Sequence, residues 1–190
     1  MAEHISKQFD ADLEAVRTRV LHMGGVVEEQ IIKAIDGLAS GNLAAIVSMH
    51  SGVKPVFQLL VYPATDMRLG QASHRENAQG YLLTADSMKW FIGHYLSGSH
   101  VEPTDPRLSP LFAADHVVAT TPPAMVITAE FDPLRDEGDA YARGLAAAGV
   151  KVQHVQAHGH MHTSITMVDV IISGVRHREQ MAAALRGFFA

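Results

Sequence analysis

The chain contains no cysteine, and this absence excludes several kinds of chemistry. Disulfide bonds, thiolate nucleophiles and cysteine-based zinc sites all need the missing side chain. Long apolar runs are also absent, because no stretch approaches the roughly 18 apolar residues of a membrane-spanning helix. The amino terminus, Met1-Ala2-Glu3-His4, has no basic region followed by an apolar stretch. We therefore expect no signal peptide, no membrane span and a cytoplasmic protein.

An excess of basic residues is lacking as well. The net charge is −5, from 15 Lys and Arg against 20 Asp and Glu, which argues against a general nucleic-acid-binding protein. Hydrophobic residues make up 47% and charged residues 18%, as is ordinary for a globular protein. A length of 190 residues suits one domain, or a domain with an added segment.

Two different patterns divide the chain near residues 36–45. From residue 4 to about residue 40, apolar side chains recur every three or four positions, from Phe9 to Leu38, as on one face of a long helix. Such a long apolar seam needs a partner helix. Gly24-Gly25 interrupts the pattern, and each glycine costs about 1 kcal/mol relative to alanine in a helix. The segment 1–40 is therefore predicted to be an amphipathic helix.

From about residue 53 onward, strand and helix patterns alternate. The predicted strands are residues 55–63, 123–129 and 150–156, and the predicted helices are residues 84–96, 135–148, 165–173 and 178–189. Thr84 is a good amino-terminal cap, and Gly149 stands where a helix would end. Residues 97–123 favour a loop. This alternation is typical of a parallel sheet with crossover helices, so the predicted fold class is α/β.

An acid and a base follow the last two predicted strands. Asp132 comes shortly after the strand at 123–129, and His162 follows the strand at 150–156. In a parallel sheet both would lie at the carboxyl edge, where open α/β folds place their sites. A carboxylate bonded to an imidazole fixes its tautomer and stabilises the imidazolium that forms when the ring takes a proton. Asp132 could instead be a turn or capping residue before Pro133, and His162 a packed or solvated histidine.

His158, His160 and His162 alternate along the chain. On a strand they would share one face and could suggest a metal site. Gly159, however, is expected to break the strand, and no carboxylate accompanies the three histidines locally. Surface roles, or roles around the site, are the better interpretation, and we expect no metal and no cofactor.

Several segments resemble the hormone-sensitive-lipase-like branch of the α/β-hydrolase family. They are Gly41-Asn42-Leu43-Ala44-Ala45, Tyr62-Pro63-Ala64-Thr65-Asp66, Asp132-Pro133-Leu134-Arg135-Asp136-Glu137-Gly138 and His160-Met161-His162-Thr163. The resemblance covers residues 41–190 and implies the carboxyl-terminal part of an α/β-hydrolase domain, hence a truncated fold with a short, mainly parallel sheet. It also implies hydrolysis of carboxylic esters, with Asp132 as triad acid and His162 as triad base, in the Ser…Asp…His order of the family.

The nucleophile departs from that family's pattern. The family's serine lies between glycines on a sharp strand-to-helix turn, and aligning the Gly41–Ala45 segment puts Leu38 at its place. Ser40 is the remaining candidate, although its spacing is wrong and a helix or cap role competes. The family's glycine-rich oxyanion loop has no counterpart, since no His-Gly-Gly run occurs. We therefore expect an incomplete site and little activity.

Residues 3–40 resemble the first helix of the PhoU family of phosphate-uptake regulators. The segments that carry the likeness are His4-Ile5-Ser6-Lys7-Gln8-Phe9-Asp10 and Leu21-His22-Met23-Gly24-Gly25-Val26-Val27-Glu28. Three functions stay open: an ester hydrolase with a small-molecule ester substrate, a helical regulatory or interaction protein, and an inactive fusion fragment. Self-association could use the amino-terminal helix or an exposed sheet edge.

Overall fold

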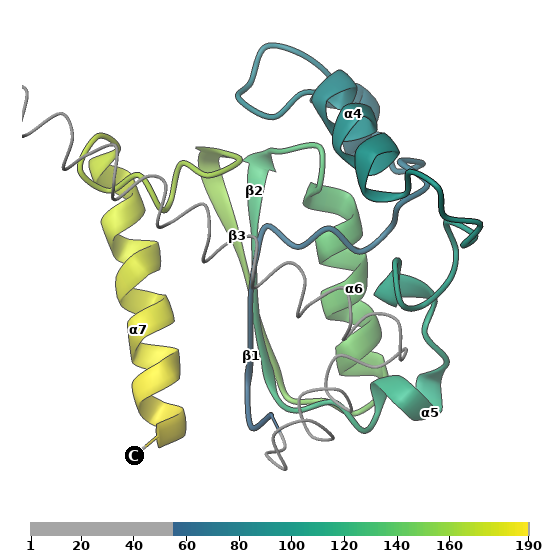
Figure 1. Cartoon of the computed structure of the whole chain (residues 1–190). Helices are drawn as coiled ribbons and strands as arrows, with labels where there is room; N and C mark the ends of the chain where they lie inside the picture. Colours follow the sequence, from purple (N-terminus) through teal and green to yellow (C-terminus); the bar gives the residue numbers. More distant parts are fainter. Residues whose placement is uncertain (1–54, 190) are drawn as a thin grey trace, which may run out of the picture.

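The computed structural model describes residues 55–189 (Figure 1). Several sequence predictions lie outside these residues: the amphipathic helix of residues 4–40, the boundary near residue 40, and the positions of Leu38 and Ser40.

Three parallel strands form the centre of this part. They are β1 (Gln58–Val61), β2 (Ala124–Phe131) and β3 (Val152–Met161), in the order β1-β2-β3. Gln58 pairs with Ala124, and Ala124 pairs with Val152 on the other side. The predicted parallel sheet is confirmed, and all three strand predictions overlap the observed strands.

Helices cover both faces of the sheet (Figure 1). On β2, Met125, Ile127 and Ala129 face an apolar cluster that includes side chains of α7 (Val175–Phe189), while Ala124 and Val126 face a cluster with α6 (Arg135–Ala147). This alternation follows from the two-residue period of a strand. Because both faces of β2 are buried, its sequence is a continuous apolar run, as expected of a central parallel strand.

Four further helical segments come between β1 and β2 in the sequence. They are α3 (Ala72–Glu76), α4 (Ala85–Tyr95), η1 (Pro110–Phe112) and α5 (Asp115–Val118). Thr84 caps α4 as predicted, since its hydroxyl accepts a hydrogen bond from the Ser87 amide at 3.1 Å. Gly149 follows α6 with φ +85°, the left-handed conformation expected after a helix end. None of the helices within residues 55–189 combines the length and apolarity that crossing a membrane requires.

Two local predictions are wrong. Gly159 does not end β3, which continues to Met161 after a shift of register between Ala129 and Phe131. Glycine permits this irregularity because it adopts φ +75° here without steric cost. The helix predicted at residues 165–173 is also absent, and isolated turns precede the short η2 (Ile172–Gly174). β-Branched residues crowd this segment and disfavour a helix: Ile165, Thr166, Val168, Val170, Ile171 and Ile172.

The contact of α6 with the sheet gives a test of packing. An alanine Cβ at Gly138 would lie 2.7 Å from the Thr128 methyl group, which cannot turn away freely because Thr128 Oγ1 donates to Asp139 at 2.7 Å. Gly138→Ala is expected to lower the free energy of unfolding by about 1–3 kcal/mol. Gly144→Ala, on the same helix with open space around it, is expected to raise it by about 0.5–1 kcal/mol. Urea denaturation of both variants is the measurement, and equal signs would contradict this account.

Candidate active site

Asp132 and His162 meet at the carboxyl edge of the sheet. Asp132 directly follows β2, and His162 directly follows β3. His162 Nδ1 lies 2.8 Å from Asp132 Oδ2, and the Asp132 side chain is 1% exposed against 22% for His162. The predicted pairing of these two residues therefore exists in the structure. A buried carboxylate beside a partly open imidazole is the arrangement that holds one ring nitrogen and leaves the other accessible.

Backbone contacts fix the carboxylate of Asp132. Its Oδ1 accepts a hydrogen bond from the Leu134 amide at 2.9 Å, which leaves Oδ2 for the imidazole. The carbonyl of Asp132 accepts from the Asn77 side chain at 3.2 Å and from the Arg135 amide at 3.1 Å. These bonds join the end of β2 to the start of α6 and to the loop after α3. The Asp132 side chain therefore has little freedom to rotate.

Tyr62, directly after β1, supports His162, a role that the sequence did not reveal. Its ring lies 4.9 Å from the His162 ring at an angle of 42°, and its hydroxyl oxygen accepts the Ile165 amide at 2.9 Å. Burial raises the pKa of Tyr62 to about 12, so the phenol stays protonated at neutral pH. Tyr62 thus contacts the His162 ring and also holds the turn that follows His162. The only signal was its place in the Tyr62–Asp66 segment quoted above.

The turn that carries His162 is tightly bonded within itself. Ser164 Oγ accepts the Met161 amide at 3.1 Å and donates to the Met161 carbonyl at 2.8 Å. Thr163 has φ +68°, which is uncommon for a residue other than glycine. A strained residue between two hydrogen-bonded neighbours gives the His162 side chain a defined direction.

A second network of buried polar groups is centred on Glu137, in the first turn of α6. Glu137 on α6 is 0% exposed, and its Oε1 accepts the backbone amides of Thr65 and Asp66, the latter at 3.1 Å. Its Oε2 lies 2.9 Å from His74 Nε2, but the two atoms are not aligned as a hydrogen bond. Glu137 therefore ties the loop after β1 to α6, next to Asp132. Two of the segments that resemble the family, Tyr62–Asp66 and Asp132–Gly138, are therefore joined through Glu137.

Asp66 closes the loop after β1. Its carboxylate accepts bonds from Arg68 Nε at 2.9 Å and Nη2 at 2.8 Å. The side-chain hydrogen bond from Arg68 is the main reason that the pKa of Asp66 lies below its usual range, because it stabilises the charged form. Both oxygens of the Asp66 carboxylate thus accept hydrogen bonds within this loop, which indicates a structural role.

The other histidines near the site do not join His162. His160 Nδ1 lies 2.8 Å from Ser164 Oγ, and exposed His158 lies 3.7 Å from Glu130. In the part of the chain that the structure describes, no cluster of three or more His, Asp and Glu side chains could hold a metal ion. The alternation of the three histidines therefore does not gather them into one site.

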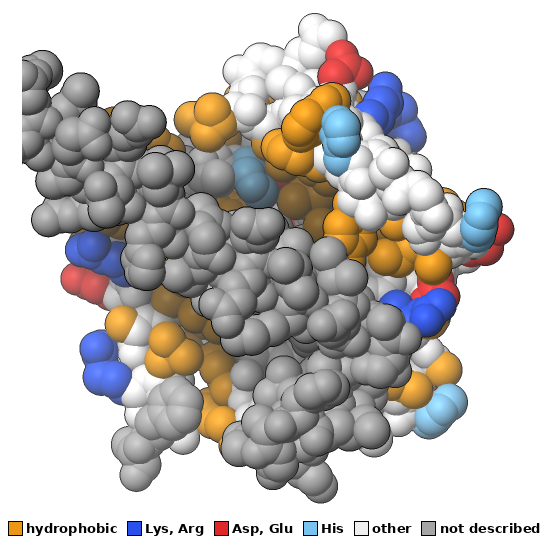
Figure 2. All heavy atoms as spheres, in the orientation of Figure 1, with side chains coloured by type: hydrophobic (Ala, Val, Ile, Leu, Met, Phe, Trp, Pro, Cys, Tyr) orange, Lys and Arg blue, Asp and Glu red, His pale blue; other side chains and the backbone are white. Residues whose placement is uncertain are grey.

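An apolar surface lies over the region of α4. Leu82, Trp90, Phe91 and Tyr95 are between 45% and 61% exposed. Figure 2, in the orientation of Figure 1, shows apolar side chains at the surface over the position of α4.

Ser40, the nucleophile candidate, lies outside the described residues. Within residues 55–189, His162 Nε2 has no hydrogen-bond partner.

Comparisons with known proteins agree with this geometry. Residues 39–166 match the family described as alpha/beta hydrolase fold. The chain is 43% identical over 122 residues to the carboxylic ester hydrolase LipN of Mycobacterium tuberculosis, covering 60% of this chain and 32% of that protein. It is 33% identical over 150 residues to the ethyl acetate hydrolase of Pseudomonas putida, covering 76% and 46%.

A similar solved structure is an α/β hydrolase from the metagenome of Lake Arreo. It has a TM-score of 0.67 and 37% identity, and the match covers 77% of this chain and 46% of that one. The chain thus spans about a third to a half of the length of these relatives. The family match covers well over half of the chain. The chain belongs to the α/β-hydrolase family.

Proposed function

We propose that the chain carries the acid and the base of a carboxylic-ester hydrolase, with Asp132 as acid and His162 as base. The observation that carries this proposal is the 2.8 Å contact between Asp132 Oδ2 and His162 Nδ1. It assigns the proton to Nδ1 and leaves the lone pair on Nε2, the atom that a general base needs. The similar proteins of Mycobacterium tuberculosis and Pseudomonas putida are ester hydrolases, which supports the same reaction class.

The chemistry follows from this tautomer. His162 Nε2 takes the proton of a serine hydroxyl while the serine oxygen attacks the ester carbonyl carbon. Asp132 stabilises the imidazolium, which then gives its proton to the departing alcohol oxygen and leaves an acyl-enzyme. A water molecule repeats the sequence, with His162 again as base, and releases the carboxylic acid.

The nucleophile is the part of this proposal that rests on sequence alone. Leu38 stands at the position of the family's serine, and a leucine has no atom that can attack an ester. Ser40 is the nearest hydroxyl, with the wrong spacing for the family's turn. We therefore propose that the unaltered chain turns over esters at a rate close to that of buffer, although it holds a usable acid–base pair.

Labelling with a fluorophosphonate tests this proposal. The probe forms a bond between serine oxygen and phosphorus, releases fluoride, and needs a base to take the serine proton. We expect no label on the unaltered chain, label on the Leu38→Ser variant, and loss of that label when His162→Ala is added. Intact mass and peptide mapping measure the adduct.

Two results would contradict the proposal. Labelling of the unaltered chain at Ser40 would show that Ser40, rather than an added serine, is the nucleophile. Labelling of Leu38→Ser that persists in the His162→Ala background would show that His162 is not the base. Far-ultraviolet circular dichroism of each variant verifies that the fold is retained.

A further inference from the structure

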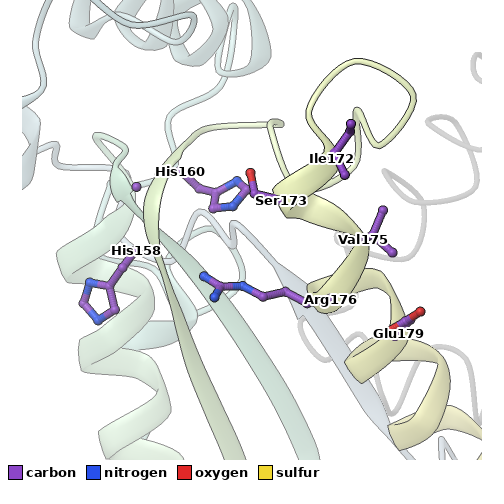
Figure 3. A pocket seen from close by; sticks show the side chains of 8 residues that line it. His158, His160, Ile172, Ser173, Val175, Arg176 and Glu179 are labelled. Atoms are coloured by element: carbon purple, nitrogen blue, oxygen red, sulfur yellow. The ribbon is translucent and has the colours of Figure 1, made fainter.

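An open pocket lies between the end of β3 and the start of α7, and neither Asp132 nor His162 lines it. Its volume is about 570 Å³. Figure 3 shows His160 pointing from β3 towards Ser173, and Arg176 reaching from α7 towards β3. The lining residues include the buried His160, the exposed His158, two apolar side chains, Glu179 and Arg176.

His177 holds Arg176 in position. The His177 side chain is buried, with its residue 4% exposed, and its Nδ1 lies 3.1 Å from Gln180 Oε1. Since an amide oxygen can only accept, Nδ1 carries the proton and Nε2 holds a lone pair. Arg176 Nε donates to that lone pair at 3.1 Å. Among residues 55–189, neither Nη nitrogen of Arg176 has a hydrogen-bond or carboxylate partner, so the fork keeps its paired donors for a ligand.

His160 is the second polar group of the pocket. It is 3% exposed, and its ring lies 5.2 Å from that of His177. Ser164 Oγ already donates to the Met161 carbonyl, so the bond to His160 is satisfied when His160 Nδ1 carries the proton. Burial, and then the charge of Arg176, lower the pKa of His160. Its Nε2 has no partner within the described residues, and it becomes a donor when an anion is bound and the ring takes a proton.

The other side chains that line the pocket determine which kind of anion fits it best. Ile172, which is 80% exposed, and Val175 are the apolar side chains among the lining residues. Glu179 also lines it and repels negative charge. A ligand with a single negative charge and a short apolar chain therefore fits better than a multiply charged ion such as phosphate.

We propose that this pocket binds the carboxylate of a short-chain aliphatic acid. Both carboxylate oxygens face the Arg176 fork, a bidentate arrangement that arginine favours, and the chain contacts Ile172 and Val175. His160 senses occupancy through its ring. Binding requires no nucleophile and no turnover, so the proposal stands or fails independently of the proposed ester hydrolysis.

Titration of the full chain with butyrate tests the proposal. We expect butyrate to shift the His160 ring signals in nuclear magnetic resonance spectra, assigned with His160→Gln, and to saturate in the millimolar range. Arg176→Gln is expected to weaken binding about tenfold or more, and Arg176→Lys by less, because lysine keeps the charge without the fork. Arg178→Gln is the matched control, since exposed Arg178 lies on the same helix but does not line the pocket.

The uncharged and multiply charged probes separate the alternatives. Butyramide has the same chain without the charge, and inorganic phosphate has the charge without the chain. Shifts of equal size with butyramide, or tighter binding of phosphate than of butyrate, would overturn the assignment of ligand class. No saturable shift with butyrate, or an equal loss in Arg178→Gln, would overturn the site itself.

Discussion

Glu137→Ala is expected to lower the free energy of unfolding by about 3–5 kcal/mol. Glu137 is 0% exposed, and its removal leaves the amides of Thr65 and Asp66 without their acceptor. It also leaves the buried His74 ring facing an empty space where a carboxylate oxygen lay at 2.9 Å. Leaving buried donors without an acceptor costs far more than an exposed side chain contributes.

Urea denaturation at neutral pH measures this effect. The control is Glu102→Ala, an exposed carboxylate in the loop between α4 and η1, with an expected change within about 0.5 kcal/mol. A loss of less than about 1 kcal/mol for Glu137→Ala would mean that water or a side-chain shift replaces the carboxylate. The account of the network as the tie between the β1 loop and α6 would then be wrong.

Asp132→Asn is expected to remove most of the base strength of His162 while leaving the fold intact. The asparagine oxygen still accepts the Leu134 amide, but its NH2 group donates to His162 Nδ1 and forces the proton onto Nε2. The ring then cannot accept a proton from a serine. In the Leu38→Ser background we expect fluorophosphonate labelling to slow by about 10⁴-fold.

The tautomer gives a readout that does not depend on turnover. Nitrogen-15 spectra of the His162 ring are expected to change from the Nδ1–H form to the Nε2–H form in Asp132→Asn. Asp139→Asn is the matched control, because Asp139 also pairs with a histidine, His154, at 2.9 Å but lies away from the site. An unchanged His162 tautomer in Asp132→Asn, or slowed labelling in Asp139→Asn, would refute the proposed role of Asp132.

The pairing of Asp132 with His162 could be predicted because it depends on short-range signals. Each residue follows an apolar strand run, and parallel strands bring their carboxyl ends to the same edge. The order of the elements predicts the common edge, and the family resemblance predicts that these two residues act together. The same argument predicted the three strands and the helix α6, whose ends are marked by local sequence.

Contacts between distant residues could not be predicted in this way. Tyr62 bonds to Ile165 over 103 positions, and Glu137 bonds to Thr65 over 72. No local pattern states which buried polar groups will meet. The helix wrongly predicted at 165–173 has the same origin, because apolar spacing suggested a helix while β-branched residues and the bond from Ile165 to Tyr62 favour turns.

The proposed acid and base are close together along the chain. They are 30 residues apart and lie at the ends of adjacent strands joined by α6. Both lie within one strand–helix–strand unit, residues 124–162, whereas Tyr62 and Asn77, which contact them, lie outside it. A fragment limited to residues 124–162 would therefore keep the two side chains but lose the contacts with Tyr62 and Asn77 that fix their positions.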